Sequence, residues 1–202
     1  PTLESSERNI TGVFHIVPMD AQLKLMRSYR PFETIGVIYT PTEQNSVAQV
    51  RLLRELSVQE GFRLVERPFP IGDDGQPDGS VLETYVAELK EEGVDWFMRL
   101  PDTFLGSLYE RMRAAIIAHK LPTFGTTERA IRTGAAVAAL VCRYYSVGQL
   151  TALKATEILV EDRPPETIPV ETLKRFSLII NIDLAKRLDV VPPLGMLTFA
   201  EI

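Results

Sequence analysis

Residues 35–46, IGVIYTPTEQNS, decide the fold class of this chain. The stretch opens with an apolar run typical of a buried strand, and a polar turn follows from residue 40. The apolar spacing after the turn predicts a helix over residues 46–60, and the run at 62–67 predicts a second strand. A strand, a helix and a strand in so few residues form a right-handed βαβ unit with parallel strands. The polar turn then lies at the carboxyl end of a strand, where parallel sheets bind their ligands.

The same alternation of strand, polar turn and helix continues along the chain. The expected further elements are strands at 94–100 and 121–124, and helices at 19–30, 81–92 and 105–119. The expected carboxyl-end turns are 40–46, 68–71, 100–103 and 125–128. The pattern predicts an α/β fold of three layers, with a Rossmann-like sheet between helices on both faces. We expect the first four strands of this sheet to be parallel, in an order resembling 2-1-3-4.

The remaining segments are a short strand near the start and four elements after residue 134. The expected ranges are strands at 9–14, 135–142 and 176–181, and helices at 147–160 and 183–188. The polar residues 1–8 are either the end of a removed leader or the cut end of a longer chain, and the sequence leaves both open.

Composition and charge exclude several classes of function. A hydrophobic fraction of 45% and a charged fraction of 24% are ordinary for a soluble globular protein. The net charge is −5 and no basic stripe is present, which argues against nucleic-acid binding. No apolar run approaches the roughly 20 residues of a membrane span. The single cysteine, Cys142, lies in an apolar run and is predicted to be a buried structural thiol.

The sequence contains no recognisable catalytic or metal-binding motif. His15 and His119 are far apart and have no partner at ligand spacing, so we expect no metal and no cofactor. The acids at the expected strand ends, Asp102 and Glu128, have no neighbour that would make them a catalytic pair. The chain is therefore predicted not to be an enzyme.

Six motifs occur in an order that resembles one family. The motifs are NITGV at 9–13, IGVIYTPTEQNSVAQV at 35–50, VD…LPD at 94–102, PTFGTTE at 122–128, GA…RYYxxGQ at 134–149 and IPVETLKRFSLIIN at 168–181. Together they resemble the ABC transporter substrate-binding proteins of the tryptophan/tyrosine-binding kind. These proteins have the type I periplasmic-binding-protein fold, in which two Rossmann-like lobes enclose the ligand. The resemblance covers nearly the whole chain.

The resemblance also implies a division of the chain. Residues 9–131 and 167–202 correspond to the second lobe, and 134–165 to the segment that returns to the first lobe. In the family, the strand and helix of this returning segment pack against first-lobe strands that precede residue 9. We therefore expect an exposed apolar surface at 134–165, and self-association of these 202 residues, most simply as a homodimer.

The turn after the first strand of the second lobe faces the ligand cleft in this family. The matching residues are Tyr39, Thr40, Glu43, Asn45 and Ser46. The resemblance implies that their polar groups hydrogen-bond a small solute. The alternative is that Asn45 or Ser46 only caps the following helix.

Two further turns supply candidates. Asp102 matches a family aspartate, and it either binds the ammonium group of a ligand or caps the helix that follows. Leu100-Pro101 replaces the serine that the family has before this aspartate. Thr126 and Glu128 follow the fourth strand, and Glu128 is either the partner of a cationic ligand group or an exposed loop residue.

The sequence departs from the family pattern at Arg143. The family usually shows Asp-Tyr-Tyr where this chain has Arg143-Tyr144-Tyr145, and that aspartate commonly faces the amino group of the ligand. Arg143 reverses the charge, which favours a carboxylate or another anion. Tyr144 either stacks on a ligand or packs at the hinge.

The resemblance implies a solute-binding component that delivers a small polar metabolite, amino-acid-like or anionic, to an ABC permease. Its expected location is periplasmic or otherwise extracytoplasmic. The alternative is a ligand-sensing domain of the same fold in a receptor or regulator, and the sequence upstream of residue 1 would separate the two.

Overall fold

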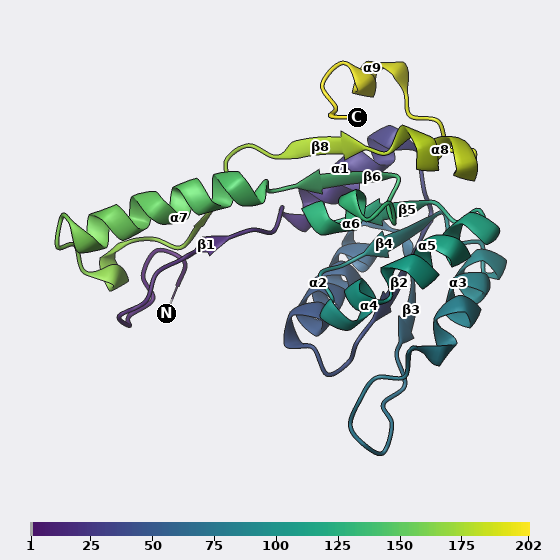
Figure 1. Ribbon diagram of the computed structural model, residues 1–202, viewed down its shortest axis with the longest axis horizontal. Helices are drawn as coiled ribbons and strands as arrows, with labels where there is room; N and C mark the ends of the chain where they lie inside the picture. The colour runs from purple at the N-terminus through teal and green to yellow at the C-terminus, as the bar shows by residue number, and fades with distance from the viewer. Residues whose placement is uncertain (1) are drawn as a thin grey trace.

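The computed structural model describes residues 2–202 and is built on one main sheet (Figure 1). The strand order is β3-β2-β4-β5-β6-β8. The strands are β2 (Thr34–Tyr39), β3 (Arg63–Pro68), β4 (Trp96–Arg99), β5 (Thr123–Gly125), β6 (Ala138–Val141) and β8 (Ser177–Ile180). All neighbouring pairs are parallel except β6 and β8. The predicted order and direction of the first four strands, β2 to β5, are confirmed.

Helices cover both faces of this sheet. Their bounds are α1 (Met19–Tyr29), α2 (Gln44–Glu60), α3 (Leu82–Glu91), α4 (Thr103–Ser107), α5 (Tyr109–Ala118) and α6 (Glu128–Arg132). Because β3 and β4 flank β2 on opposite sides, right-handed crossovers place α2 and α3 on opposite faces. α1 packs beside α2, and α3 packs beside α5. The α/β class and the three layers follow from this arrangement.

Local sequence explains where these helices end. α2 stops at Gly61, whose φ of 72° is the left-handed conformation that glycine adopts without steric cost. The predicted helix 105–119 is instead two helices, α4 and α5, which meet at Leu108. Asp102 caps α4, and its position fixes where the first of these helices begins.

Aromatic side chains fill the centre of the core. Trp96 is fully buried, and its ring meets Tyr29 edge-on at 5.4 Å and Phe124 edge-on at 6.3 Å between centroids. On β2, Gly36 lets α3 approach the sheet closely, since a Cβ there would lie 2.9 Å from Leu89 Cδ2. These contacts pack α1 against β4 and α3 against β2.

The strand predicted at 135–142 lies elsewhere than expected. β6 pairs with β5 on one side and β8 on the other, inside the main sheet, and is not part of another lobe. The expectation that it packs against strands absent from this chain is wrong. The physical reason lies in its small side chains: a Cβ on Gly125 would lie 3.1 Å from Ala136 Cβ and 3.3 Å from Ala139 Cβ. Such close packing suits a strand that is buried on both faces.

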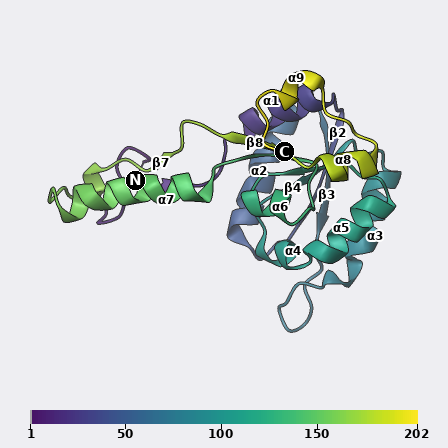
Figure 2. The ribbon, with the colours of Figure 1, turned by 45° about the horizontal axis from the view of Figure 1, so that its top comes forward.

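The helix after β6 does extend away from the lobe. α7 (Tyr144–Leu159) projects as an arm together with two short parallel strands, β1 (Val13–Phe14) and β7 (Glu171–Thr172) (Figures 1 and 2). β1 is shorter than the predicted strand 9–14. The short helices η1 (Gly79–Val81), η2 (Pro165–Thr167), α8 (Ile182–Leu188) and α9 (Leu194–Leu197) complete the described chain.

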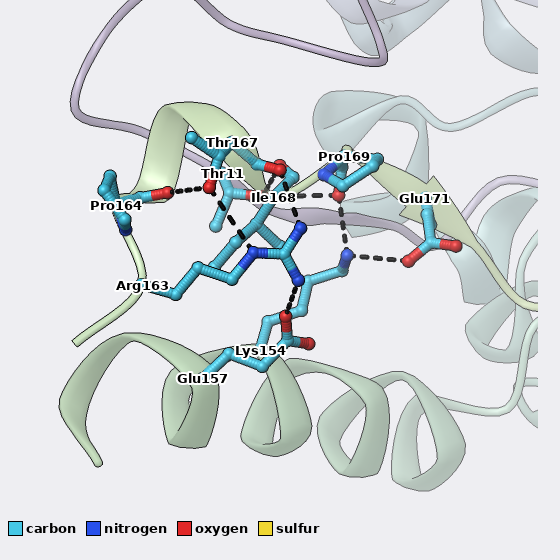
Figure 3. A network of polar contacts seen from close by, with 9 residues as sticks. All are labelled: Thr11, Lys154, Glu157, Arg163, Pro164, Thr167, Ile168, Pro169 and Glu171. Carbon is cyan, nitrogen blue, oxygen red and sulfur yellow. Dashed lines mark hydrogen bonds and ion pairs between the residues drawn. The ribbon is translucent and has the colours of Figure 1, made fainter. Parts of the chain in front are cut away.

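A polar network holds the arm together (Figure 3). Lys154 Nζ donates to the Pro169 carbonyl at 2.6 Å and to the Glu171 carboxylate at 2.7 Å. Thr11 Oγ1 donates to the Ile168 carbonyl at 2.8 Å, which attaches the N-terminal segment. The arm thus joins α7, β7 and the segment before β1. None of the helices within residues 2–202 has the length and apolarity needed to cross a bilayer.

Candidate functional site

Asp102 joins two strand-end turns at the carboxyl edge of the sheet. Its carboxylate accepts hydrogen bonds from Thr40 N at 2.7 Å, Thr40 Oγ1 at 3.0 Å and Ser46 Oγ at 2.8 Å. It also accepts from Leu105 N at 2.7 Å, as the N-cap of α4. Thr40 and Ser46 are almost fully buried. These three predicted site residues do come together, but their polar atoms satisfy one another.

Glu43 and Asn45 strengthen the same connection from the turn before α2. The Glu43 carboxylate accepts from Thr103 N and Phe104 N, both at 2.8 Å, and so satisfies free N–H groups at the start of α4. Asn45 Nδ2 donates to the Pro101 carbonyl at 3.1 Å. Asn45 and Ser46 lie inside α2 and are not its cap, so the capping alternative for these two residues does not apply.

A small hollow opens beside this connection. It has a volume of about 380 Å³ and lies between the turn after β2, the long loop after β3 and helix α4. Its lining residues are Thr40, Thr42, Glu43, Gln76, Pro77, Thr103, Phe104 and Ser107. The lining thus combines hydroxyl, amide and carboxylate groups with the aromatic side chain of Phe104. Two of the predicted site residues, Thr40 and Glu43, therefore border a space that can accept a small molecule.

Tyr39 points into a different environment. Its hydroxyl donates to Glu66 at 3.4 Å, and Glu66 is held by Arg54 at 2.8 Å. Burial, followed by the negative charge of Glu66, raises the pKa of Tyr39. Tyr39 thus belongs to the contact between α2 and β3 and does not line the hollow.

Glu128 is the centre of a second cluster, at the ends of β5 and β6. Its carboxylate accepts from Arg132 Nε at 2.9 Å and from Tyr144 N at 3.1 Å, and Arg143 Nη1 lies 3.3 Å away. Burial favours a higher pKa for Glu128. The hydrogen bonds from Tyr144 and Arg132 and the charge of Arg143 outweigh it and lower the pKa. Glu128 is buried, unlike an exposed loop glutamate.

Arg143 lies between two carboxylates. Its Nη1 is 3.3 Å from Glu128 Oε1 and 3.2 Å from Glu201 Oε2. Both contacts are ion pairs without hydrogen-bond geometry, so within the described chain Nη1 is buried without an acceptor. The positive charge that the sequence showed at this position is therefore largely compensated. Beside it, the Tyr144 ring is half-exposed and contacts His15 with centroids 6.0 Å apart.

Thr126 has a structural role in the sheet. It is buried, and its hydroxyl donates to the Arg99 carbonyl at 2.9 Å, which ties β5 to the end of β4. Of the predicted site residues, Thr126 thus joins neither the hollow nor the Glu128 cluster.

Arg99 is a candidate that sequence reasoning missed. Its side chain is 5% exposed, and Nη1 makes one long contact, 3.5 Å to Thr133 Oγ1. No carboxylate within residues 2–202 lies close enough to form an ion pair with it. Burial above all, and then the charge of Arg129, lower the pKa of Arg99 to about 10, against the attraction of Asp102. The available signal was a lone arginine in the apolar strand VDWFMRL at 94–100.

A second hollow, larger than the first, lies beside the Glu128 cluster. It has a volume of about 720 Å³ and lies between α6, β8 and the C-terminal tail. None of the ten predicted site residues lines it, although its lining residues Arg132 and Glu201 contact the Glu128 cluster. We favour the smaller hollow because it lies at the carboxyl ends of parallel strands.

The described residues offer no metal site and no reactive thiol. No group of three or more His, Cys, Asp or Glu side chains within residues 2–202 is placed to hold a metal ion. Cys142 is buried next to Thr172, and burial raises the pKa of its thiol. A raised pKa makes the reactive thiolate rarer, as expected of a structural cysteine.

Comparisons with known proteins agree on one group of relatives. A family model described as "ABC transporter substrate binding protein" matches residues 1–201. The tyrosine-binding protein of Clostridioides difficile is 27% identical over 189 residues, which are 93% of this chain and 52% of that protein.

Solved structures show the same fold. A conserved domain protein from Vibrio cholerae has a TM-score of 0.82 at 28% identity, over 98% of this chain and 64% of that one. An ABC domain from Streptococcus pneumoniae in complex with L-Trp has a TM-score of 0.80 at 21% identity, with the same coverage of 98% and 64%. The chain thus spans about half to two thirds of the length of these relatives.

Proposed function

The chain belongs to the family of ABC transporter substrate-binding proteins, and from this premise we propose that it is part of the solute-binding component of a transporter. This family consists of substrate-binding proteins and not of enzymes, in agreement with the absence of a catalytic motif in the sequence. The proposed solute is a small polar metabolite, amino-acid-like or anionic.

One observation carries this proposal: the hollow of about 380 Å³ bordered by Thr40 and Glu43 at the carboxyl ends of the strands. Its volume is in the range of small-molecule sites. The hydroxyl of Thr42 and the amide of Gln76 can donate to and accept from a polar solute. The Ser107 hydroxyl donates to the Phe104 carbonyl and can accept from the solute, and the Phe104 ring offers an apolar contact. The names of two relatives mention tyrosine and L-Trp, which supports a solute of amino-acid size.

We place the solute in a cleft between this lobe and a second lobe. α7 supports the presence of such a lobe, because it buries a charged side chain and exposes its large apolar ones. The one buried side chain of α7 is Lys154, whereas Tyr145, Leu153 and Leu159 are 79%, 64% and 79% exposed. An apolar helix that buries its lysine needs a further partner. In a full-length protein that partner is a second lobe; in the 202-residue chain alone it is a second copy, which gives a homodimer.

The clusters at Asp102 and Glu128 then act as the rigid floor of the cleft. Because the two carboxylates are already hydrogen-bonded, they keep the turns in place without a ligand, which lowers the entropic cost of binding. Arg143 and Tyr144 lie where the sheet meets the arm, and we propose that they close the other end of the cleft. Delivery to a membrane permease on the extracytoplasmic side completes the proposed function.

The test is a thermal-shift screen of the full-length protein against amino acids and small organic acids. A solute present at 100 times its Kd stabilises the folded state by about 2.7 kcal/mol. We expect stabilisation by at least one amino-acid-like or anionic solute, and a weaker effect in Ser107→Ala and Gln76→Ala. Arg51→Gln, an exposed change on α2, serves as the control that keeps the response. The absence of any stabilising solute, or full responses in both hollow variants, contradicts the proposal.

A further inference from the structure

The side chain of Arg99 lies between two helices that offer it no negative partner. Towards α4 it faces Gly106, where a Cβ would lie 3.6 Å from Arg99 Nη2. Towards α6 it reaches Thr133, whose hydroxyl already donates to the Arg129 and Ala130 carbonyls. Thr133 therefore meets Arg99 only as a weak acceptor at 3.5 Å. Most of the five N–H donors of this guanidinium have no partner within the described chain.

The charges around Arg99 do not compensate it. Arg129 on α6 repels it, and this repulsion contributes to the lowered pKa of Arg99. Asp102 attracts Arg99, but its two oxygens accept four hydrogen bonds from Thr40, Ser46 and Leu105. Arg129 itself has no carboxylate at ion-pair distance within residues 2–202. Two positive side chains therefore share one region in which no carboxylate of the described residues lies at ion-pair distance from either of them.

An oxyanion would satisfy both side chains at once. The guanidinium fork matches the spacing of two oxygens in a carboxylate or phosphate group, and such charge-assisted pairs are strong where water is partly excluded. A cation or a neutral apolar group would leave the same N–H donors unsatisfied. We therefore propose that Arg99, with Arg129, forms a binding site for an oxyanion, the carboxylate or phosphate group of a small molecule, between α4 and α6.

This proposal goes beyond solute binding in the hollow and does not depend on it. Neither Arg99 nor Arg129 lines the hollow of about 380 Å³. The site can therefore bind a free anion in the 202-residue chain even if no solute binds at Thr40 and Glu43. A functional role also explains why an arginine stands at a position where its neighbours Trp96, Phe97 and Met98 are fully buried and apolar.

The test is the melting temperature of the chain at pH 7 with sodium phosphate or sodium acetate, at constant ionic strength set by sodium chloride. We expect stabilisation by phosphate, acetate or both over chloride, and the stronger of the two identifies the group that is bound. R99M should lower the affinity for that anion at least about tenfold, since a hydrogen bond to a charged group is lost. R129Q should lower it less. R51M, on the exposed face of α2, should leave the anion response unchanged.

A second expected result separates a binding site from a structural arginine. In chloride alone R99M should melt at a higher temperature than the unaltered chain, because an uncompensated buried charge has been removed. If R99M does not fold, R99K keeps the charge but not the planar fork, and it should fold and bind the anion more weakly. The proposal is overturned if neither anion stabilises the unaltered chain. It is also overturned if R99M or R99K keeps the full anion response, or if R99M melts lower than the unaltered chain in chloride.

Discussion

The Asp102 carboxylate lies 2.7 Å from the backbone nitrogen of Thr40, and this contact joins the turn after β4 to the end of β2. Both Asp102 oxygens are shared between the N–H groups of Thr40 and Leu105 and the hydroxyls of Thr40 and Ser46. Asp102 is therefore not a free carboxylate that is available to bind the ammonium group of a ligand. Asp102 instead builds the frame on which the hollow rests.

Replacing Asp102 by alanine should therefore be strongly destabilising. The change removes the cap of α4 and leaves the buried Thr40 and Ser46 without their acceptor, at a cost of about 2–4 kcal/mol in the free energy of unfolding. Asp102→Asn keeps one acceptor oxygen and should cost less. Urea unfolding followed by circular dichroism measures both. Equal stability of Asp102→Ala and the unaltered chain would contradict the structural role of this carboxylate.

Glu128 should make stability depend on pH in the acidic range. Its pKa in the folded chain is lowered, so the ionised form is favoured by folding. The contribution is then complete above the unfolded pKa of about 4.3 and is lost as the pH falls through the lower folded pKa. The melting temperature should fall between pH 5 and pH 3, and Glu128→Gln should reduce this fall while it lowers stability at pH 7. An identical acid profile in both chains would contradict the assignment.

Much of the fold follows from the sequence because its signals are local. The alternation after residue 35 and the stop at Gly61 placed β2, α2 and β3, and the polar turns indicated the sheet edge at which the candidate site lies. The break at Leu108 between α4 and α5 was missed, because nothing in the spacing of residues 105–119 interrupts the helical pattern. Helix ends of this kind depend on packing as well as on propensity.

The position of β6 and the roles of the site residues depend on contacts distant in sequence. The apolar run at 135–142 is compatible with a strand in either lobe, and only its pairing with β5 and β8 shows that it belongs to the main sheet. Similarly, the residue types at Thr40, Ser46 and Asp102 indicate hydrogen bonding but not its direction. The three side chains bond to one another because their turns meet at one edge of the sheet. Pairing of this kind appears only in three dimensions.

Lys154 should control how firmly the arm is held. Its side chain is 4% exposed and is bound by the Pro169 carbonyl and by Glu171. Lys154→Ala removes both contacts and leaves a space, so we expect faster backbone hydrogen exchange at residues 165–172. Lys154→Met retains the volume of the side chain and should have a smaller effect. Exchange that is unchanged in Lys154→Ala would show that the strand pair β1 and β7 holds the arm by itself.

The apolar face of α7 should make the 202-residue chain self-associate. Leu153 and Leu159 are 64% and 79% exposed, and burying each is worth roughly 1.5–3 kcal/mol. We expect light scattering after size-exclusion chromatography to give the mass of a dimer. The double change Leu153→Glu and Leu159→Glu should give a monomer, because it places charges on the face that the proposed dimer buries. Val58→Glu, at a position on α2 that is 82% exposed, is the matched control and should remain dimeric. A monomeric unaltered chain at high protein concentration would show that the apolar side chains of α7 stay exposed to water. The proposal that a second copy covers them would then be wrong.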